Sequence, residues 1–215
     1  MQSCALTGGI AVELHCCRAA GKPSPRVLSD VDFVAPAFEF IPETLADDYL
    51  FRHVHPGAAA GQTMLQIVDA YAGLRIDVFR ASQATLSRTS VFEFPCGPVR
   101  IVSAVDLLAR HTRLLLSLAE EIPVASKHAR DFVRLLDIVI IRDALVAWPD
   151  HRRPDHPENF ADAIALVREL MKSRRDLLIT PQFSKDMHQS CPRCTSHGRF
   201  QPCDPAVALE VLGYC

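Results

Sequence analysis

The chain lacks a strong net charge, a long apolar run and a leader-like start. Its 215 residues carry 23 Lys and Arg against 25 Asp and Glu, so the formal net charge of −2 gives no overall field that would gather nucleic acid. No apolar stretch approaches the ~20 residues of a membrane span. The N-terminus has neither a basic start nor a small-residue cleavage site, which predicts no signal peptide. We therefore expect a cytoplasmic protein without a membrane span.

An RNA substrate would need a local basic patch. The sequence offers two candidates, Arg152-Arg153 and residues 172–175. The other interpretation of each is a solvated helix face or loop.

Eight cysteines in a chain of this kind predict thiols or metal ligands rather than disulfides. Near the C-terminus a Cys-x-x-Cys turn is followed by a third cysteine, a pattern in which thiolates hold one Zn²⁺. The predicted structural zinc ligands are Cys191, Cys194, Cys203 and His197, with His188 or Cys215 as alternatives to His197. The other interpretation is a flexible tail with spare thiols.

Two aspartates stand two residues apart in the β-prone segment Leu28-Ser29-Asp30-Val31-Asp32-Phe33. On a strand this spacing points both carboxylates to one face, about 7 Å apart along the backbone. Like charges there repel unless a cation lies between them, and Mg²⁺ held by carboxylates and substrate phosphates meets that need. Upstream, Gly8-Gly9 lets a backbone approach a phosphate at a strand-to-helix turn. The combination predicts phosphoryl or nucleotidyl transfer, whereas a lone Asp-x-Asp would also suit a solvated strand end.

The order of three sequence elements resembles the nucleotidyltransferase superfamily that includes DNA polymerase beta. Gly8-Gly9 precedes an apolar helix, Arg26 and Ser29 come just before the aspartate pair, and a third acid follows in Leu74-Arg75-Ile76-Asp77-Val78-Phe79, with Arg75 on the face of Asp77. More closely, the chain resembles the bacterial minimal nucleotidyltransferases related to the AbiEii toxin. These carry a Gly-Gly, an Arg-x-x-Ser-Asp-x-Asp and a later Asp.

The resemblance extends over roughly residues 5 to 140. Residues 99–103, followed by Asp106, are similar to the strand that leads into the family's first C-terminal helix, and Lys127-His128-Ala129-Arg130-Asp131 is similar to the signature that opens the next. There are two departures. The segment after Gly9 is longer than usual, and His111 stands where relatives carry a lysine. We also expect an upstream helix of the relatives to be missing, or lost through the choice of start site.

The resemblance implies a Mg²⁺-dependent transfer of a nucleoside monophosphate from an NTP to an acceptor hydroxyl. Asp30 and Asp32 would bind the metal, and Asp77 would complete the site and act as, or position, the base. The implied nucleotide-binding residues are Gly8, Gly9, Arg26, Ser29, Lys127, Arg130 and Asp131. Candidate acceptors are tRNA, a protein or a small molecule. Relatives serve as toxins of toxin–antitoxin systems, which would make an antitoxin protein a partner.

Apolar periodicity and turn residues predict the secondary structure. Strands are expected over 3–7, 28–35, 63–68, 74–79, 91–94 and 99–102, with the last four forming two hairpins. Helices are expected over 9–20, 103–121, 126–148 and 158–178, with a helical turn within 42–52 and a short last helix after residue 204. Ser103 and Asp106 form a capping box, and Ser126 is expected to cap the next helix.

Strands first and helices second predict an α+β protein: a nucleotidyltransferase-like mixed β-sheet with flanking helices, then a small helical bundle and a Cys-rich tail. The expected domains are a catalytic domain over 1–102, the bundle over 103–180 and the zinc-binding tail over 181–215.

Two other functions stay open. A non-catalytic member of the same fold would keep the acids and bind a nucleotide or partner through its helical half, which His111 favours. A zinc-dependent nucleic-acid-binding module would rest on the cysteine tail alone and would predict a more basic chain.

Overall fold

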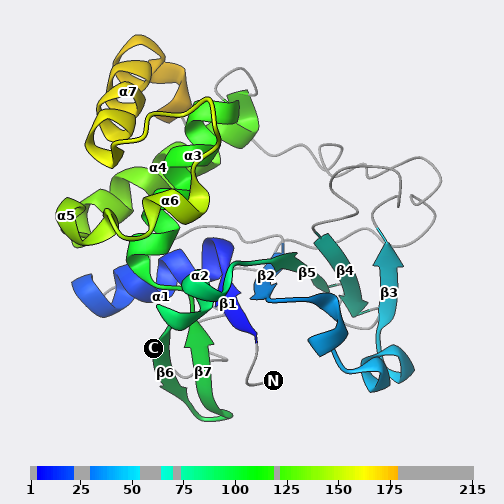
Figure 1. Ribbon diagram of the computed structural model, residues 1–215. Coiled ribbons are helices and arrows are strands. Elements are labelled where there is room, and N and C mark those ends of the chain that lie inside the picture. The colour runs from blue at the N-terminus through cyan, green and yellow to red at the C-terminus, as the bar shows by residue number, and fades with distance from the viewer. Residues whose placement is uncertain (1–3, 22–29, 54–63, 70–73, 119–121, 179–215) are drawn as a thin grey trace. The chain divides into compact units, whose positions relative to one another are not determined.

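The computed structural model describes residues 4–21, 30–53, 64–69, 74–118 and 122–178. These residues form two compact units, divided between Val102 and Ser103. The first unit contains the sheet and the second is helical (Figure 1). The fold class is therefore α+β, as the order of the predicted elements indicates.

A mixed seven-stranded sheet organises the first unit, in the order β3-β4-β5-β2-β1-β7-β6. Its strands are β1 (Ala5–Thr7), β2 (Asp30–Ala35), β3 (Leu50–His53), β4 (Met64–Asp69), β5 (Leu74–Arg80), β6 (Ser90–Phe94) and β7 (Gly97–Ile101). Both predicted hairpins are present as antiparallel pairs, β4 with β5 and β6 with β7. Strand β2 pairs in parallel with β5 and antiparallel with β1, so the strand with the aspartate pair lies inside the sheet.

The prediction for 42–52 was wrong in part. Instead of one helical turn, the segment contains a 3₁₀ helix, η2 (Glu43–Asp47), and then the edge strand β3, which pairs antiparallel with β4. Another 3₁₀ helix, η1 (Phe38–Phe40), precedes them. Strand formation depends on the neighbour that a segment meets in space, and the local pattern of this segment does not contain that information.

Alternation along the strands gives the sheet one apolar face. Buried residues of three strands pack there with side chains from η1 and its surroundings: Ala35, Leu65, Ile67 and Val78, with Phe33, Phe38, Ile41, Tyr49 and Ile76 against them. Because successive side chains on a strand point to opposite faces, Gln66 and Asp77 point away from this core. The polar residues of β4 and β5 therefore share the opposite face.

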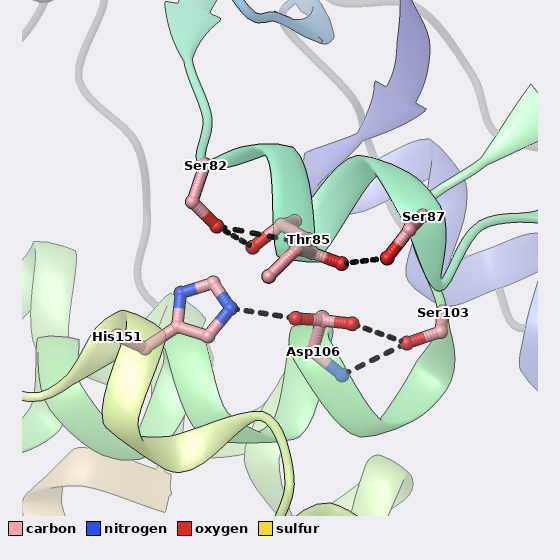
Figure 2. A network of polar contacts seen from close by, with 7 residues as sticks. Ser82, Thr85, Ser87, Ser103, Asp106 and His151 are labelled. Atoms are coloured by element: carbon pink, nitrogen blue, oxygen red, sulfur yellow. Dashed lines mark hydrogen bonds and ion pairs between the residues drawn. The ribbon is translucent and has the colours of Figure 1, made fainter.

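Two helices belong to the first unit. Helix α1 (Gly8–Ala20) starts directly after β1 and packs against β1 and β2. It ends at Gly21, whose φ of 66° is left-handed and whose N–H donates to the carbonyl of Cys17 at 2.6 Å. Helix α2 (Gln83–Ser87) is capped by Ser82, whose Oγ accepts a hydrogen bond from the N–H of Thr85 at 3.1 Å (Figure 2).

The second unit is built around α3 (Ala104–Leu118), which contacts the other α-helices of this unit. These are α4 (Ile122–Ile138), α5 (Ile141–Ala144), α6 (Trp148–His151) and α7 (Phe160–Ser173), followed by the 3₁₀ helix η4 (Arg175–Leu178). Fully buried apolar side chains fill the space between them: Leu107, Leu108, Leu115, Phe132, Leu135, Trp148 and Phe160.

The predicted capping box opens α3. Oγ of Ser103 accepts a hydrogen bond from the N–H of Asp106 at 3.2 Å and donates to its Oδ2 at 2.6 Å. The other carboxylate oxygen of Asp106 lies 3.0 Å from Nε2 of His151 (Figure 2). The side chain of Asp106 thus joins the start of α3 to α6.

Helices α4 and α7 differ from the prediction in their boundaries. Helix α4 begins at Ile122, so Ser126 lies inside it, and the helix ends at Ile138 rather than near residue 148. Four successive β-branched residues, 138–141, are weak helix formers, and Ile140 is extended with φ −75° and ψ 117°. Helix α7 begins at Phe160 rather than residue 158, because the side chain of Asn159 caps it by accepting from the N–H of Ala161 at 2.9 Å.

None of the described helices combines the length and apolar character needed to cross a bilayer.

Candidate functional site: an acid cluster on the sheet

Three carboxylates converge on the polar face of the first unit's sheet. One oxygen from each of Asp30, Asp32 and Asp77 lies within 4.8 Å of the other two. The register of the parallel pair β2–β5 places Asp32 beside Asp77, and Asp30 lies two residues back on the same face of β2. The juxtaposition therefore follows from the strand spacing together with the register.

Arg75 lies among these acids. It is in register with Asp30, and its Nη2 forms an ion pair with Oδ2 of Asp30 and lies 3.1 Å from Oδ2 of Asp77. Asp30 and Asp77 are only 8% and 5% exposed, and carboxylates that have lost most of their water need a nearby positive charge. The sequence placed Arg75 on the face of Asp77, but its contact with Asp30 depends on pairing between strands far apart in the chain.

Two buried polar residues extend the row of acids, and sequence reasoning missed both. Thr7 of β1 is in register with Asp32, and Gln66 of β4 is in register with Asp77. Thr7 is 1% exposed and Gln66 is 7% exposed. A polar residue inside the apolar strand Leu65-Gln66-Ile67 was the signal that could have identified Gln66.

Gly8, the first residue of α1, lies directly against the carboxylate of Asp32. A Cβ at this position would lie 1.7 Å from Oδ2 of Asp32, and the φ of Gly8 is +66°. Any other residue would therefore be both strained and in collision with the acid. Because a helix N-terminus favours negative charge, this end of α1 suits the carboxylate or a ligand phosphate beside it. The predicted phosphate-binding role of Gly8 and Gly9 stays a prediction.

The other predicted nucleotide-binding residues of the described chain lie on α4. Asp131 is 1% exposed, and its Oδ2 lies 3.8 Å from Nε2 of His111 on α3. Lys127 and Arg130 are half-buried. His111 is thus part of a buried histidine–aspartate contact. The roles of Lys127, Arg130 and Asp131 stay predictions.

A second histidine completes this contact. The rings of His111 and His128 lie 5.2 Å apart between centroids. Burial, followed by the neighbouring His111 and Lys127, lowers the pKa of His128 well below its ordinary value, and Asp131 opposes this effect. His128 is therefore neutral at pH 7.

Several predicted residues lie outside the described residues: Arg26, Ser29, Cys191, Cys194, His197 and Cys203, with the alternatives His188 and Cys215. The short helix expected after residue 204 lies outside them too. Within the described part of the chain, the group of at least three His, Cys, Asp or Glu residues that could hold a metal ion is Asp30, Asp32 and Asp77.

Comparison with known proteins finds similarity among solved structures. No family model matches the sequence, and no curated protein matches it. Among solved structures, the chain is similar to an antigenic nucleotidyltransferase-like protein from Paracoccidioides brasiliensis, with 17% identity, coverage of 81% of each chain and a TM-score of 0.43. A likeness of this degree does not establish membership of a family.

Proposed function

We propose that the protein is a divalent-metal-dependent nucleotidyltransferase that moves a nucleoside monophosphate from an NTP to an acceptor hydroxyl. The observation that carries this proposal is the convergence of three carboxylates from β2 and β5 on one face of the sheet. Carboxylate oxygens, completed by substrate phosphates, are the ligands that Mg²⁺ takes in such enzymes.

The donor set fits a hard divalent cation. Two ligands on opposite sides of Mg²⁺ are about 4.2 Å apart, since each bond is about 2.1 Å long. The three carboxylate oxygens lie up to 4.8 Å from one another. Small side-chain rotations would shorten the largest of these distances to about 4.2 Å. Arg75 already places a positive charge against Asp30 and Asp77, so this position stabilises cations. A bound metal would supply neutralisation of the phosphate charge and activation of the acceptor oxygen.

The chain's own residues have separate tasks in this proposal. Asp30 and Asp32 would hold the ion, and Asp77 would hold it and accept or orient the proton of the acceptor hydroxyl. The N-terminus of α1 at Gly8 would bind phosphate oxygens through backbone N–H groups. Arg75 would keep Asp30 and Asp77 in place and reduce their mutual repulsion.

The test is label transfer. The protein is incubated with Mg²⁺ and each α-labelled NTP, with and without total RNA, and products are separated by size. We expect label on RNA or protein in the presence of Mg²⁺, no label with EDTA, and no label for Asp32→Asn. Asp69→Asn is the matched control, because Asp69 ends β4 outside the cluster and should leave transfer unchanged. Absence of transfer with every NTP would contradict the enzyme assignment.

A non-catalytic nucleotide- or partner-binding protein of the same fold is the second candidate. The buried contact between His111 and Asp131 favours it, because the lysine that the relatives carry at position 111 is missing. Retention of labelled NTP without transfer would support this candidate over the enzyme.

Finer parts of the proposal come from the resemblance in sequence. The acceptor would be tRNA, a protein or a small molecule, and the physiological role that of a toxin held inactive by an antitoxin protein in the cytoplasm. Growth arrest on induced expression, relieved by Asp32→Asn, would support the toxin role. Unaffected growth in a host in which transfer is detected would contradict it.

A further inference from the structure

Three arginines gather on the helical unit, in a part of the chain that the proposed transfer reaction does not use. Arg110 and Arg113 are three residues apart on α3, a spacing that puts two side chains on one helix face. Arg153 follows α6, in the basic pair noted in the sequence. His156 contacts both Ser117 of α3 and the backbone of Arg153, which brings Arg153 near the helix. The charges of Arg110 and Arg153 both lower the pKa of Arg113.

A histidine fixes the backbone of Arg153 close to this face of α3. The backbone N–H of Arg153 donates to Nδ1 of His156 at 3.3 Å. Nδ1 is therefore the acceptor, and Nε2, at 3.3 Å from Oγ of Ser117, carries the proton. Ser117 is four residues beyond Arg113, one turn further along the same face of α3. The turn that bears Arg153 is thus fixed against the two helix arginines.

Aromatic packing makes the same turn rigid. The ring of His156 stacks on the buried Trp148, with centroids 6.1 Å apart and planes at 10°. Nε1 of Trp148 donates to the carbonyl of Pro157 at 2.9 Å. Burial lowers the pKa of His156, so its neutral form keeps both hydrogen bonds at pH 7, although the nearby carboxylate of Asp155 raises that pKa somewhat. The backbone position of Arg153 is therefore fixed by the fold.

Arg113 has lost part of its contact with water, and its Nε gains no hydrogen bond within the described part of the chain. Its side chain is half-buried, and its Nε is covered and has no hydrogen-bond partner among the described residues. Burial, followed by the charges of Arg110 and Arg153, lowers the pKa of Arg113 to about 10. It therefore stays charged at pH 7, with like charges around it. A bound anion would lower the electrostatic energy of Arg113 at this position.

We propose that Arg110, Arg113 and Arg153 bind a phosphate group of a nucleotide or of RNA. Guanidinium groups are planar, stay charged and match phosphate oxygens with parallel N–H donors. The incomplete hydration of Arg113 strengthens its attraction to an anion, because the effective dielectric constant near it is below that of water. This site does not depend on the acid cluster being catalytic.

Binding is measured without divalent metal, so that the acid cluster cannot contribute. In EDTA, fluorescence anisotropy with a labelled single-stranded RNA of twelve nucleotides gives Kd at several salt concentrations. Tryptophan quenching, from Trp148 next to the site, gives binding of ATP and of inorganic phosphate. Arg113→Ala should weaken binding by about tenfold, the usual loss for a hydrogen bond to a charged group. Arg153→Ala should do so too, and should lower the salt slope by about one.

Matched variants distinguish loss of the binding site from loss of one positive charge and from failure to fold. Arg142→Ala removes one positive charge from the same unit at a position where the side chain is 82% exposed, and it should leave Kd nearly unchanged. Arg113→Lys keeps the charge but not the planar fork and should retain only part of the affinity. Arg153 is exposed on a turn, so Arg153→Ala tests the site even if Arg113→Ala fails to fold.

The outcomes are distinct. If Arg113→Ala and Arg153→Ala weaken the binding of RNA alone, the site binds an RNA backbone. If they weaken the binding of ATP and inorganic phosphate, the site binds a nucleotide. Equal Kd values for wild type, Arg153→Ala and Arg142→Ala with all three probes would overturn the proposal. If the wild-type protein shows no transfer activity but the arginine variants still bind the probes more weakly, the proposed enzyme activity is refuted and the proposed phosphate site is kept.

Discussion

Nη2 of Arg75 lies 3.1 Å from Oδ2 of Asp77, two residues further along the same strand. The contact is possible because residues two apart on a strand point to one face. The same nitrogen forms an ion pair with Asp30 on the neighbouring strand. In the absence of a metal, an arginine of the chain therefore balances the charge of two buried acids, and a divalent cation at the cluster would share or replace that task.

Replacing Arg75 should make the protein more dependent on metal. Arg75→Met should lower the Tm of metal-free protein, because breaking a buried ion pair costs up to about 3–5 kcal/mol. Adding Mn²⁺ should then raise Tm more in the variant than in the wild type, since the ion replaces the missing charge. Thermal unfolding in EDTA and in Mn²⁺ measures both values. Arg142→Met, at an exposed position, is the control, and an equal Mn²⁺ effect in wild type and Arg75→Met would contradict the argument.

The acids should differ in their effect on stability. Asp32→Asn should leave the free energy of unfolding in EDTA unchanged or raised, because it relieves repulsion among the carboxylates. Asp30→Asn removes the ion pair with Arg75 and should lower it by about 1–3 kcal/mol. Both changes should abolish transfer. Urea unfolding measures the stabilities, and a lower value for Asp32→Asn than for Asp30→Asn would refute this ordering.

Two glycines with the same backbone angle allow a test of the contact between α1 and Asp32. Gly8 and Gly21 both have φ +66°, but a Cβ at Gly21 meets nothing within 4 Å, whereas one at Gly8 meets Asp32. Gly21→Ala should cost about 1–2 kcal/mol for the left-handed backbone alone. Gly8→Ala should cost clearly more and should also weaken Mn²⁺ binding, because Asp32 must move. Urea unfolding and Mn²⁺ titration test this, and equal costs with unchanged Mn²⁺ affinity would count against the contact.

The stability of the protein should fall at mildly acidic pH. The folded pKa of His128 is lowered, so only the unfolded chain takes up this proton as pH falls below about 6.5. The resulting loss of stability is absent above about pH 6.5 and grows below it. His15 and His156 also have lowered pKa values through burial and act in the same direction.

The contribution of His128 appears as a difference between proteins. Urea unfolding at pH 7.5 and pH 5.5 should show a smaller loss of stability for His128→Gln than for the wild type. An identical loss in the two proteins would mean that His128 is not kept neutral in the fold.

The cysteine tail carries its own prediction. Protein purified under reducing conditions should contain about one zinc per chain, held by Cys191, Cys194, Cys203 and His197. Cys191→Ser should release it, whereas Cys96→Ser, at an exposed cysteine of the first unit, should not. Metal analysis that finds no zinc in the wild-type protein would leave only free thiols.

A local pattern was enough to place Asp30 and Asp32 on one face, because strands have a period of two. Asp77 was added by the resemblance in the order of sequence elements, and its strand spacing placed it on the face of Arg75. Ser103 with Asp106 was equally readable, because a capping box is a contact between residues three apart. The two hairpins also joined segments close in sequence. These features depend on interactions across a few residues, so their signals lie in consecutive letters.

The remaining features depended on contacts between distant segments. The register of β2 against β5 decided that Arg75 pairs with Asp30, and the pairing of β4 with β5 brought Gln66 beside Asp77. Edge strand β3 likewise formed because β4 was available to it. In the same way, His156 joined Ser117 of α3 to the backbone of Arg153. By itself the sequence determined which residues are acidic, basic or apolar and which face of an element each occupies, while only the tertiary structure decided their neighbours, because strand pairing and helix packing join residues that no local period connects.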